Sequence, residues 1–239
     1  MEKYTLITGA TSGIGLEMAK ILAFRNHNLI LVARNFEKLN TIQNEFELAY
    51  GIKVKIYKVD LSNSSNAKLL FNKIQEEKLD VEYLINNAGV GNYGLFTKTN
   101  LDEELEMIEL NISSLVILTK LFSQKMVKRG FGKIMNVASL LSFLPFPYYS
   151  VYSATKTFVL AFSETVNAEL EGTGVMVKAL CPGPVDTGFT TSEMATTNAY
   201  KANKPVSPEY VANEGVKLLF NAKTKKIVGF NNWFISNLP

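Results

Sequence analysis

Three side chains in one stretch of the sequence have the types and spacing needed for acid–base chemistry. Tyr152 and Lys156 are four residues apart at the start of a helical pattern, so both would lie on one helix face. A phenol with a pKa of about 10 is a poor acid at neutral pH, but a nearby ammonium group stabilises the phenolate and lowers that pKa. Such a phenol can give a proton to a carbonyl oxygen or take one from an alcohol. Ser139 follows a strand-like run and could hydrogen-bond the same oxygen.

Taken alone, a Tyr-x-x-x-Lys pair more often belongs to a capped amphipathic helix with a solvated lysine than to a catalytic site. Ser142 and Ser150 are alternative hydroxyls, but Ser139 follows the strand directly. Cys181 is the only cysteine, and we interpret it as a small buried apolar residue. The catalytic interpretation therefore depends on the elements that would position these side chains.

Length and composition predict one α/β domain over residues 1–239. Hydrophobic residues make up 47% of the chain, enough for a sizeable core. The net charge is +3 and the basic residues are scattered, so nothing supports nucleic-acid binding. The single cysteine excludes an intrachain disulfide and indicates a cytoplasmic location. No apolar run is long enough to span a bilayer, and the N-terminus does not resemble a signal peptide.

A glycine-rich turn directly follows the first predicted strand. Residues 4–8 form an apolar run, Gly9, Gly13 and Gly15 follow it, and a helix is expected over about 14–26. Free backbone N–H groups at a helix N-terminus bind phosphate, and missing side chains let it come close. The turn could also be only a tight connection, but its place after the first strand favours a phosphate site.

The end of the second strand indicates which dinucleotide would bind. Residues 28–33 are apolar throughout, as a strand buried on both faces should be, and Arg34 follows them. A carboxylate at this position would hold a ribose 2′-hydroxyl, whereas a basic residue accommodates a 2′-phosphate. The absence of a carboxylate therefore points to NADP(H), the alternative being a surface arginine at the start of a helix.

Polar and small residues follow the later strands as well. Asp60 follows a strand over 53–59, where it would meet an adenine amine or cap the next helix. Asn87 follows a strand over 81–86, where it can pin backbone groups beside the small residues Ala88 and Gly89. Because the carboxyl ends of parallel strands share one edge of a sheet, we expect these side chains to lie near Ser139.

Two later features remain open from the residues alone. Asn111 falls in the middle of a long helix expected over 101–128, where an amide is either exposed to solvent or engaged in a specific contact. A strand over 176–180 ends at an irregular turn containing Pro182 and Gly183. The polar segment around 188–205 that follows is expected to form a substrate lid.

The chain resembles the short-chain dehydrogenase/reductase family over nearly its full length. The resemblance rests on several segments in a fixed order, which are residues 8–15, Asp60-Leu61, residues 86–89, Asn111, Ser139, residues 152–156 and Pro182-Gly183. It implies a Rossmann-type, doubly wound parallel sheet of about seven strands with helices on both faces. Residues 32–35 are similar to those of NADP-preferring members.

The resemblance also implies a role for each site residue. Tyr152 would be the general acid, Lys156 would hold the nicotinamide ribose and lower the pKa of Tyr152, and Ser139 would orient the carbonyl. Asn111 would hold a water in a proton relay to Lys156. No metal is expected. The residues expected to contact NADP(H) are Gly9, Thr11, Ser12, Gly13, Ile14, Gly15, Arg34, Asp60, Leu61, Asn87, Ala88, Gly89, Tyr152, Lys156, Pro182, Gly183, Val185 and Thr187.

The sequence thus predicts an NADP(H)-dependent oxidoreductase that interconverts a carbonyl and an alcohol. Apolar residues near the expected site favour an apolar ketone, aldehyde or 3-oxoacyl substrate, and the candidates to line its pocket are Leu140, Leu141, Phe143, Phe146, Tyr149 and Phe189. Two alternatives remain, a catalytically silent nucleotide-binding or scaffold protein of the same fold and an epimerase or dehydratase. Similar proteins commonly pair through the helix over 101–128 and the helix after Tyr152, so we expect a homodimer or homotetramer.

Overall fold

A seven-stranded parallel sheet forms the centre of the molecule, as expected. The computed structural model describes residues 2–188 and 204–229. The strands follow the order β3-β2-β1-β4-β5-β6-β7, so the chain winds outward from β1 in both directions. The strands are β1 (Lys3–Thr8), β2 (Asn28–Ala33), β3 (Val54–Lys58), β4 (Asp80–Asn86), β5 (Gly132–Val137), β6 (Val175–Cys181) and β7 (Lys225–Ile227). The sequence predicts the last strand over 226–230; β7 begins one residue earlier, and residue 230 lies outside the described residues.

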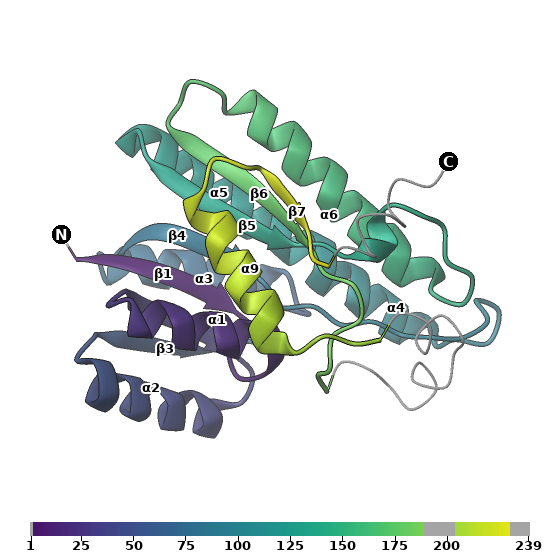
Figure 1. The fold of residues 1–239 in the computed structure, drawn as a ribbon, viewed down its shortest axis with the longest axis horizontal. Helices are drawn as coiled ribbons and strands as arrows, with labels where there is room; N and C mark the ends of the chain where they lie inside the picture. The colour runs from purple at the N-terminus through teal and green to yellow at the C-terminus, as the bar shows by residue number, and fades with distance from the viewer. Residues whose placement is uncertain (1, 189–203, 230–239) are drawn as a thin grey trace.

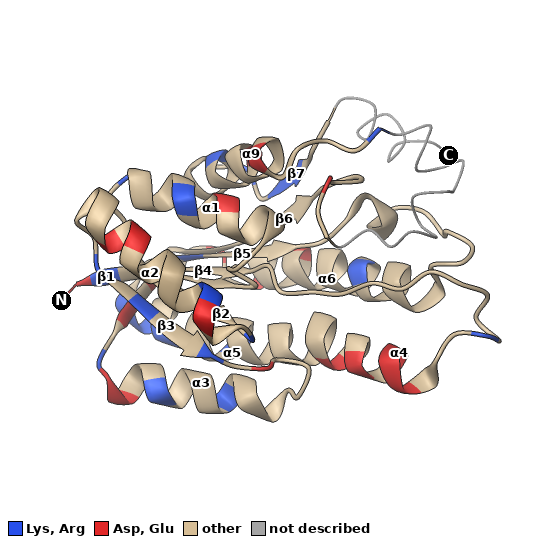
Figure 2. Ribbon diagram, turned by 90° about the horizontal axis from the view of Figure 1, so that it is seen from below, with Lys and Arg blue, Asp and Glu red and all other residues tan. Residues whose placement is uncertain are grey.

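Helices cover both faces of the sheet (Figures 1 and 2). One face carries α1 (Gly13–Phe24), α2 (Phe36–Tyr50) and α9 (Pro208–Phe220). The other face carries α3 (Ser65–Glu76), α4 (Leu101–Ile108), α5 (Leu115–Arg129) and α6 (Ser150–Glu169). Within the described residues, no helix is both long enough and apolar enough to cross a membrane.

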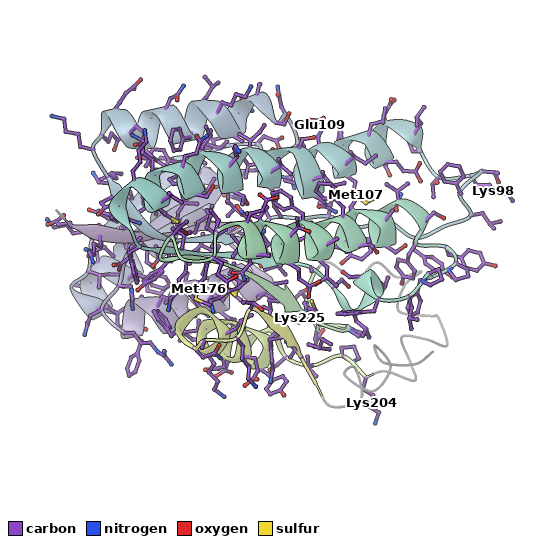
Figure 3. The ribbon with its side chains drawn as sticks, turned by 90° about the horizontal axis from the view of Figure 1, so that it is seen from above. Lys98, Met107, Glu109, Met176, Lys204 and Lys225 are labelled. Atoms are coloured by element: carbon purple, nitrogen blue, oxygen red, sulfur yellow. The ribbon has the colours of Figure 1, made fainter. Side chains whose placement is uncertain are left out.

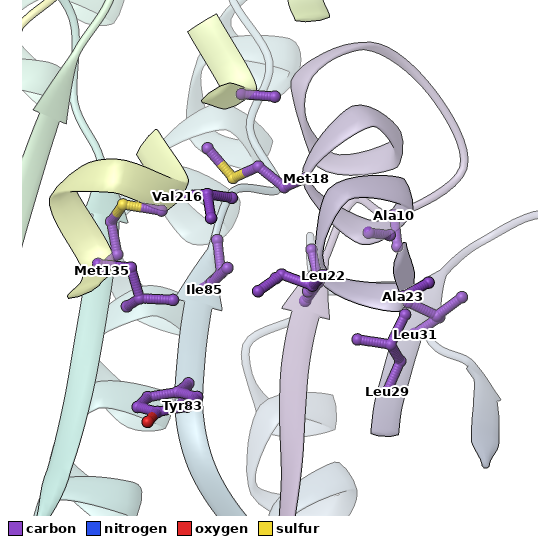
Figure 4. Packing of buried hydrophobic residues seen from close by; sticks show 14 of the residues in the cluster. Ala10, Met18, Leu22, Ala23, Leu29, Leu31, Tyr83, Ile85, Met135 and Val216 are labelled. Atoms are coloured by element: carbon purple, nitrogen blue, oxygen red, sulfur yellow. The ribbon is translucent and has the colours of Figure 1, made fainter. Parts of the chain in front are cut away.

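The buried apolar side chains of the first face hold α1 and α9 against the strands (Figure 4). Met18 and Leu22 of α1 are fully buried, as are Val216 of α9 and Met135 of β5. A Cβ at Gly215 would lie only 2.4 Å from Cε of Met18, so the glycine allows α1 and α9 to approach closely. Burying each large apolar side chain contributes roughly 1.5–3 kcal/mol, which fixes the layers on the sheet.

The sequence predicts Asn35 as the N-cap of a helix, because its residue type precedes apolar residues at helical spacing, and the start of α2 confirms this prediction. Asn35 is the N-cap residue, and its side chain accepts a hydrogen bond from the backbone N–H of Lys38. Arg34 is therefore placed between the end of β2 and a capped helix start.

The prediction of one regular helix over 101–128 is wrong in its middle. A π-helical segment, Glu109–Ser114, separates α4 from α5. A π-helical turn takes in an additional residue and so rotates the side chains on one side of it relative to those on the other. The helical spacing of the apolar residues places Leu105 on a buried stripe, but it is 51% exposed, whereas Asn111 is buried.

The expected lid around 188–205 cannot be compared fully with the structure. Residues 189–203 lie outside the described residues. The described ends of the segment are joined, because Val185 and Val206 form a parallel β-bridge and Asp186 N–H donates to the carbonyl of Val206.

Candidate active site

The carboxyl ends of β1, β4, β5 and β6 bring the expected site residues to one edge of the sheet. Asn86 of β4 pairs with Asn136 of β5, and Val137 of β5 pairs with Leu180 of β6. The turn after β5 is held to the turn after β6, because Leu140 N–H donates to the carbonyl of Pro182 at 2.7 Å. This register confirms that the segments after β5 and β6 adjoin.

Tyr152 lies in the first turn of α6 and is 9% exposed. Burial raises the pKa of Tyr152 to about 12, because an apolar environment disfavours the phenolate. A hydrogen bond with the Ser139 side chain acts in the opposite direction and lowers the pKa. The expectation that Lys156 would lower this pKa differs from the structure, in which burial dominates and the lowering contribution comes from Ser139. Tyr152 is therefore a protonated group at neutral pH.

Lys156 is one turn further along α6 and is also buried. Its Nζ lies 5.8 Å from the ring centroid of Tyr152 and donates a hydrogen bond to the carbonyl of Val137 at 2.9 Å. Burial lowers the pKa of Lys156 to about 8, so most of the side chain is still charged at neutral pH. A Cβ at Gly89 would lie 3.3 Å from this Nζ and 3.1 Å from Oδ1 of Asn111, so a side chain there would crowd both groups.

Asn111 is buried, and its side-chain amide forms hydrogen bonds on both sides. Its Oδ1 accepts from Val90 N–H at 3.1 Å, and its Nδ2 donates to the carbonyl of Val90 and to Oγ1 of Thr155. Thr155 in turn donates to the carbonyl of Tyr152 at 2.8 Å. The amide therefore ties the turn after β4 to α6, between the two candidate catalytic residues.

Ser142, considered above only as an alternative hydroxyl, has a different place. Its Oγ accepts from Ser139 N–H and donates to the carbonyl of Lys156 at 2.7 Å. The hydroxyl thus links the backbones of Ser139 and Lys156, within a 3-10 helix over Leu140–Ser142. The only sequence signal for this link is a serine three residues after Ser139, which is the spacing of a capping box.

The glycine-rich turn, which we call the glycine cradle, packs so closely against the turn after β4 that side chains on Gly9 or Gly15 would clash with it. Gly9 has a left-handed φ of 66°, and a Cβ there would lie 2.9 Å from Nδ2 of Asn87. A Cβ at Gly15 would lie 2.4 Å from the same nitrogen. Asn87 Nδ2 donates to the carbonyls of Thr8 and Gly9, and Oγ1 of Thr8 accepts from the N–H groups of Asn87 and Ala88. Sequence reasoning missed Thr8, whose hydroxyl holds β1 and the turn after β4 together.

The start of α1 faces the segment after β6. A Cβ at Gly13 would lie 3.1 Å from Cγ2 of Thr187, so residues far apart in sequence meet here. Ser12 is the N-cap of α1, but its side chain makes no capping hydrogen bond. Thr11, Ile14 and Gly183 are half-buried, and Val185 is buried beside α1. The cradle therefore fits a phosphate-bearing ligand, for which the first-turn N–H groups of α1 are suitable donors.

Arg34 and Asp60 lie near each other at the adjacent strand ends. Asp60 Oδ1 accepts from the backbone N–H and the hydroxyl of Ser62, which lowers the pKa of Asp60, and the charge of Arg34 lowers it further. Arg34 is exposed and, among the described residues, forms no hydrogen bond or ion pair. Leu61 is buried, and its carbonyl accepts from the Ser114 hydroxyl. A cationic side chain is thus available at the position expected for a 2′-phosphate.

Cys181 matches the apolar interpretation. The thiol is buried at the end of β6, and burial raises its pKa to about 12, so it is a poor nucleophile at neutral pH. In residues 2–188 and 204–229, no cluster of three or more His, Cys, Asp or Glu side chains could bind a metal ion.

Known proteins resemble this chain over most of its length. A family model described as short chain dehydrogenase matches residues 3–198. The ketoacyl reductase HetN of Nostoc is 34% identical over 230 residues, which cover 96% of this chain and 79% of that protein. Human 17-beta-hydroxysteroid dehydrogenase type 3 is 35% identical over 194 residues, 80% of this chain and 61% of that protein, so the chain spans about three fifths of its length.

A solved structure agrees with the fold. A short-chain dehydrogenase from Sphingobium yanoikuyae, in complex with NADPH, superposes with a TM-score of 0.87 at 26% sequence identity. The match covers 99% of this chain and 96% of that chain.

Proposed function

The chain belongs to the short-chain dehydrogenase/reductase family, and on this premise we propose that it is an NADP(H)-dependent oxidoreductase that interconverts an apolar carbonyl compound and its alcohol. The proposal rests on one observation above all. A buried Tyr152 is hydrogen-bonded to Ser139 and lies beside a buried lysine, at the sheet edge that carries the glycine cradle. The names of the similar proteins, a ketoacyl reductase and a hydroxysteroid dehydrogenase, support the same chemistry.

The proposed mechanism assigns proton transfer to this chain's own residues. Bound NADPH would supply the hydride. Tyr152, protonated at neutral pH, donates its proton from Oη to the carbonyl oxygen in reduction. Ser139 Oγ hydrogen-bonds the same oxygen and polarises the carbonyl. Ser139, whose hydrogen bond lowers the pKa of Tyr152, also stabilises the phenolate left after proton transfer. Lys156 Nζ lies 5.8 Å from the ring centroid of Tyr152 and would hold the nicotinamide ribose beside it.

We assign the cofactor contacts to the residues around the cradle. The backbone of the turn and of the first turn of α1 would bind the pyrophosphate, Arg34 the 2′-phosphate, and Asp60 with Leu61 the adenine. Asn87, Ala88 and Gly89 would lie along the cofactor, and Lys156 would hold the nicotinamide ribose. Four residues would border the nicotinamide amide, namely Pro182, Gly183, Val185 and Thr187. The bound NADPH of the Sphingobium yanoikuyae structure supports the choice of dinucleotide.

Arg34→Ala is expected to raise KM for NADPH by about 10- to 100-fold and to leave KM for NADH nearly unchanged. The reason is that a charge-assisted hydrogen bond to phosphate contributes about 1.5–3 kcal/mol, and NADH lacks the 2′-phosphate. Initial-rate kinetics with both cofactors measure the effect. Arg25→Ala removes an exposed arginine at the far end of α1 and is the matched control. An equal change in KM for both cofactors would defeat the assignment.

The side chains near Tyr152 support an apolar substrate. Leu140 is buried and Phe143 half-buried in the segment between β5 and α6, and Tyr149 lies beside Tyr152. Phe189, another expected pocket residue, lies outside the described residues.

We also propose a cytoplasmic location. The lone, buried Cys181 thiol supports a reducing compartment.

We propose that the protein is a homodimer or homotetramer paired through α4, α5 and α6. Figure 3 shows α4 and α6 side by side, with Met107 between them. Leu101 and Leu105 of α4 and Phe158 of α6 leave apolar surface exposed. Figure 2 shows that α4 is acidic, whereas α5 ends in basic residues, so antiparallel pairing of two copies would bring opposite charges together.

Light scattering at micromolar concentration is expected to give the mass of two or four chains for the wild type. Leu105→Lys should shift it toward one chain, because the charge would be buried in the interface. Leu48→Lys is the matched control, since Leu48 is 90% exposed on α2. A monomeric wild type would contradict this mode of assembly.

A further inference from the structure

A row of tyrosine rings leads from the protein surface to the proposed acid. Tyr148 and Tyr93 have ring centroids 5.4 Å apart with planes tilted by 34°, and Tyr93 meets Tyr149 edge-on at 5.0 Å. Tyr149 then lies 6.4 Å from Tyr152. Tyr148 is 46% exposed, Tyr93 and Tyr149 are half-buried, and Tyr152 is buried. The four rings therefore form a continuous series of contacts from an exposed side chain to the proposed acid.

The row joins two segments that are distant in sequence. Tyr93 belongs to the connection between β4 and α4, whereas Tyr148 and Tyr149 precede α6. Gly94 N–H donates to the carbonyl of Tyr148 at 2.9 Å, so a backbone hydrogen bond accompanies the ring contact. We refer to the Tyr93–Tyr148 ring pair with this hydrogen bond as the tyrosine clasp.

Tyr148 adopts an unfavourable backbone conformation to make these contacts. Its φ is +70°, in the left-handed region that bulky residues rarely occupy. The following N–H, that of Tyr149, donates to the carbonyl of Phe146 and closes the turn. Such strain persists only where surrounding contacts hold it, and it tends to occur at functional sites. A glycine or asparagine would fit this backbone better, which indicates that the tyrosine side chain itself has a role.

We propose that the tyrosine clasp is the specificity determinant of the site and selects rigid, flat, ring-bearing apolar ketones. This inference rests on the proposed function. A planar ring system can lie along the aromatic row while its carbonyl oxygen reaches Tyr152, and aromatic faces favour such offset contacts. A flexible alkyl chain gains less from the same rings, because ordering it costs conformational entropy. The clasp is remote from the reacting atoms, so it affects substrate binding rather than proton transfer.

The test compares two ketones with the same number of carbon atoms, the bicyclic β-tetralone and the linear methyl octyl ketone, with NADPH as reductant. Tyr93→Leu and Tyr148→Asn are each expected to lower kcat/KM for β-tetralone by about 10-fold, through KM. For methyl octyl ketone the change should stay below about 2-fold. The double variant should lose no more than either single variant, because the two rings act together.

Tyr148→Gly keeps the inference testable if another variant folds poorly. It removes the ring and the backbone strain together, so the melting temperature should stay at or above that of the wild type while the preference for β-tetralone falls. Unchanged NADPH affinity checks that each variant is folded. Tyr50→Leu is the matched control, because Tyr50 packs against Phe24 and Phe46 at the far end of α2.

The possible results separate this inference from the proposed function. Equal losses with both ketones, independent losses from the two rings, or a marked fall in the melting temperature of Tyr148→Gly would overturn the clasp as a specificity determinant. A wild type that reduces neither these ketones nor other carbonyl compounds would overturn the proposed function, and this inference with it.

Discussion

Tyr152→Phe is expected to lower kcat for carbonyl reduction by about 10²- to 10⁴-fold, the range that a positioned general acid supplies. The substitution removes only the hydroxyl that donates the proton. The apolar ring still fits its buried site, so the fold and the NADPH affinity should be retained. Steady-state kinetics with NADPH and an apolar ketone measure the loss, and fluorescence titration measures the retained binding.

Tyr83→Phe is the matched control for this prediction. Tyr83 is a buried tyrosine of β4, and burial also raises the pKa of its phenol. It packs against Phe131 and Phe220, away from Ser139, and its loss should not affect turnover. A Tyr152→Phe protein with a near-wild-type rate would remove Tyr152 from the mechanism, whatever the fold.

Lys156→Met is expected to lower kcat/KM for NADPH by about 10²-fold or more. The substitution removes a positive charge and, with it, the contact proposed for the nicotinamide ribose. Methionine occupies a similar volume in the buried site, so packing should be largely retained. Lys178→Met is the matched control, because Lys178 is another buried lysine, whose Nζ donates to the carbonyls of Asn221 and Lys223.

The pH dependence gives the Lys156 prediction a second readout. Because the pKa of Lys156 is about 8, kcat/KM for NADPH should fall as the pH rises through that value, and the fall should be absent in Lys156→Met. The free energy of unfolding depends on pH in the opposite direction. The unfolded lysine binds more protons than the folded one between a pKa of about 8 and the ordinary lysine pKa of 10.5, so the free energy of unfolding rises with pH across this window. A flat rate profile in the wild type would contradict the role given to the lysine charge.

Most of the fold could be predicted because it depends on patterns that are local in sequence. The strand over 28–33 matches β2 at both ends, since a continuous apolar run between turn residues specifies a strand buried on both faces. The cap at Asn35 was predicted for the same local reason. The π-helical segment was not predictable, because it depends on how Asn111 reaches Val90 and Thr155 across space.

The polar contacts of the candidate site could also be predicted only in part. The sequence predicted that Ser139, Tyr152 and Lys156 would come together at one sheet edge. The capping-box spacing of Ser139 and Ser142 indicated only a local contact, whereas the link from Ser142 to the backbone of Lys156 needs the turn geometry of residues 139–142. The pKa of Tyr152 differs from the expectation for a similar reason, since the degree of burial of a side chain is a property of the folded molecule.

Consumption of NADPH by the purified wild-type protein, in the presence of apolar ketones, tests the central claim most directly. The account predicts that NADPH is oxidised in step with alcohol formation, that NADH serves poorly, and that Tyr152→Phe binds NADPH without consuming it. Tight binding of NADPH with no consumption across aldehydes, ketones and 3-oxoacyl compounds would contradict the account and favour a nucleotide-binding protein without turnover.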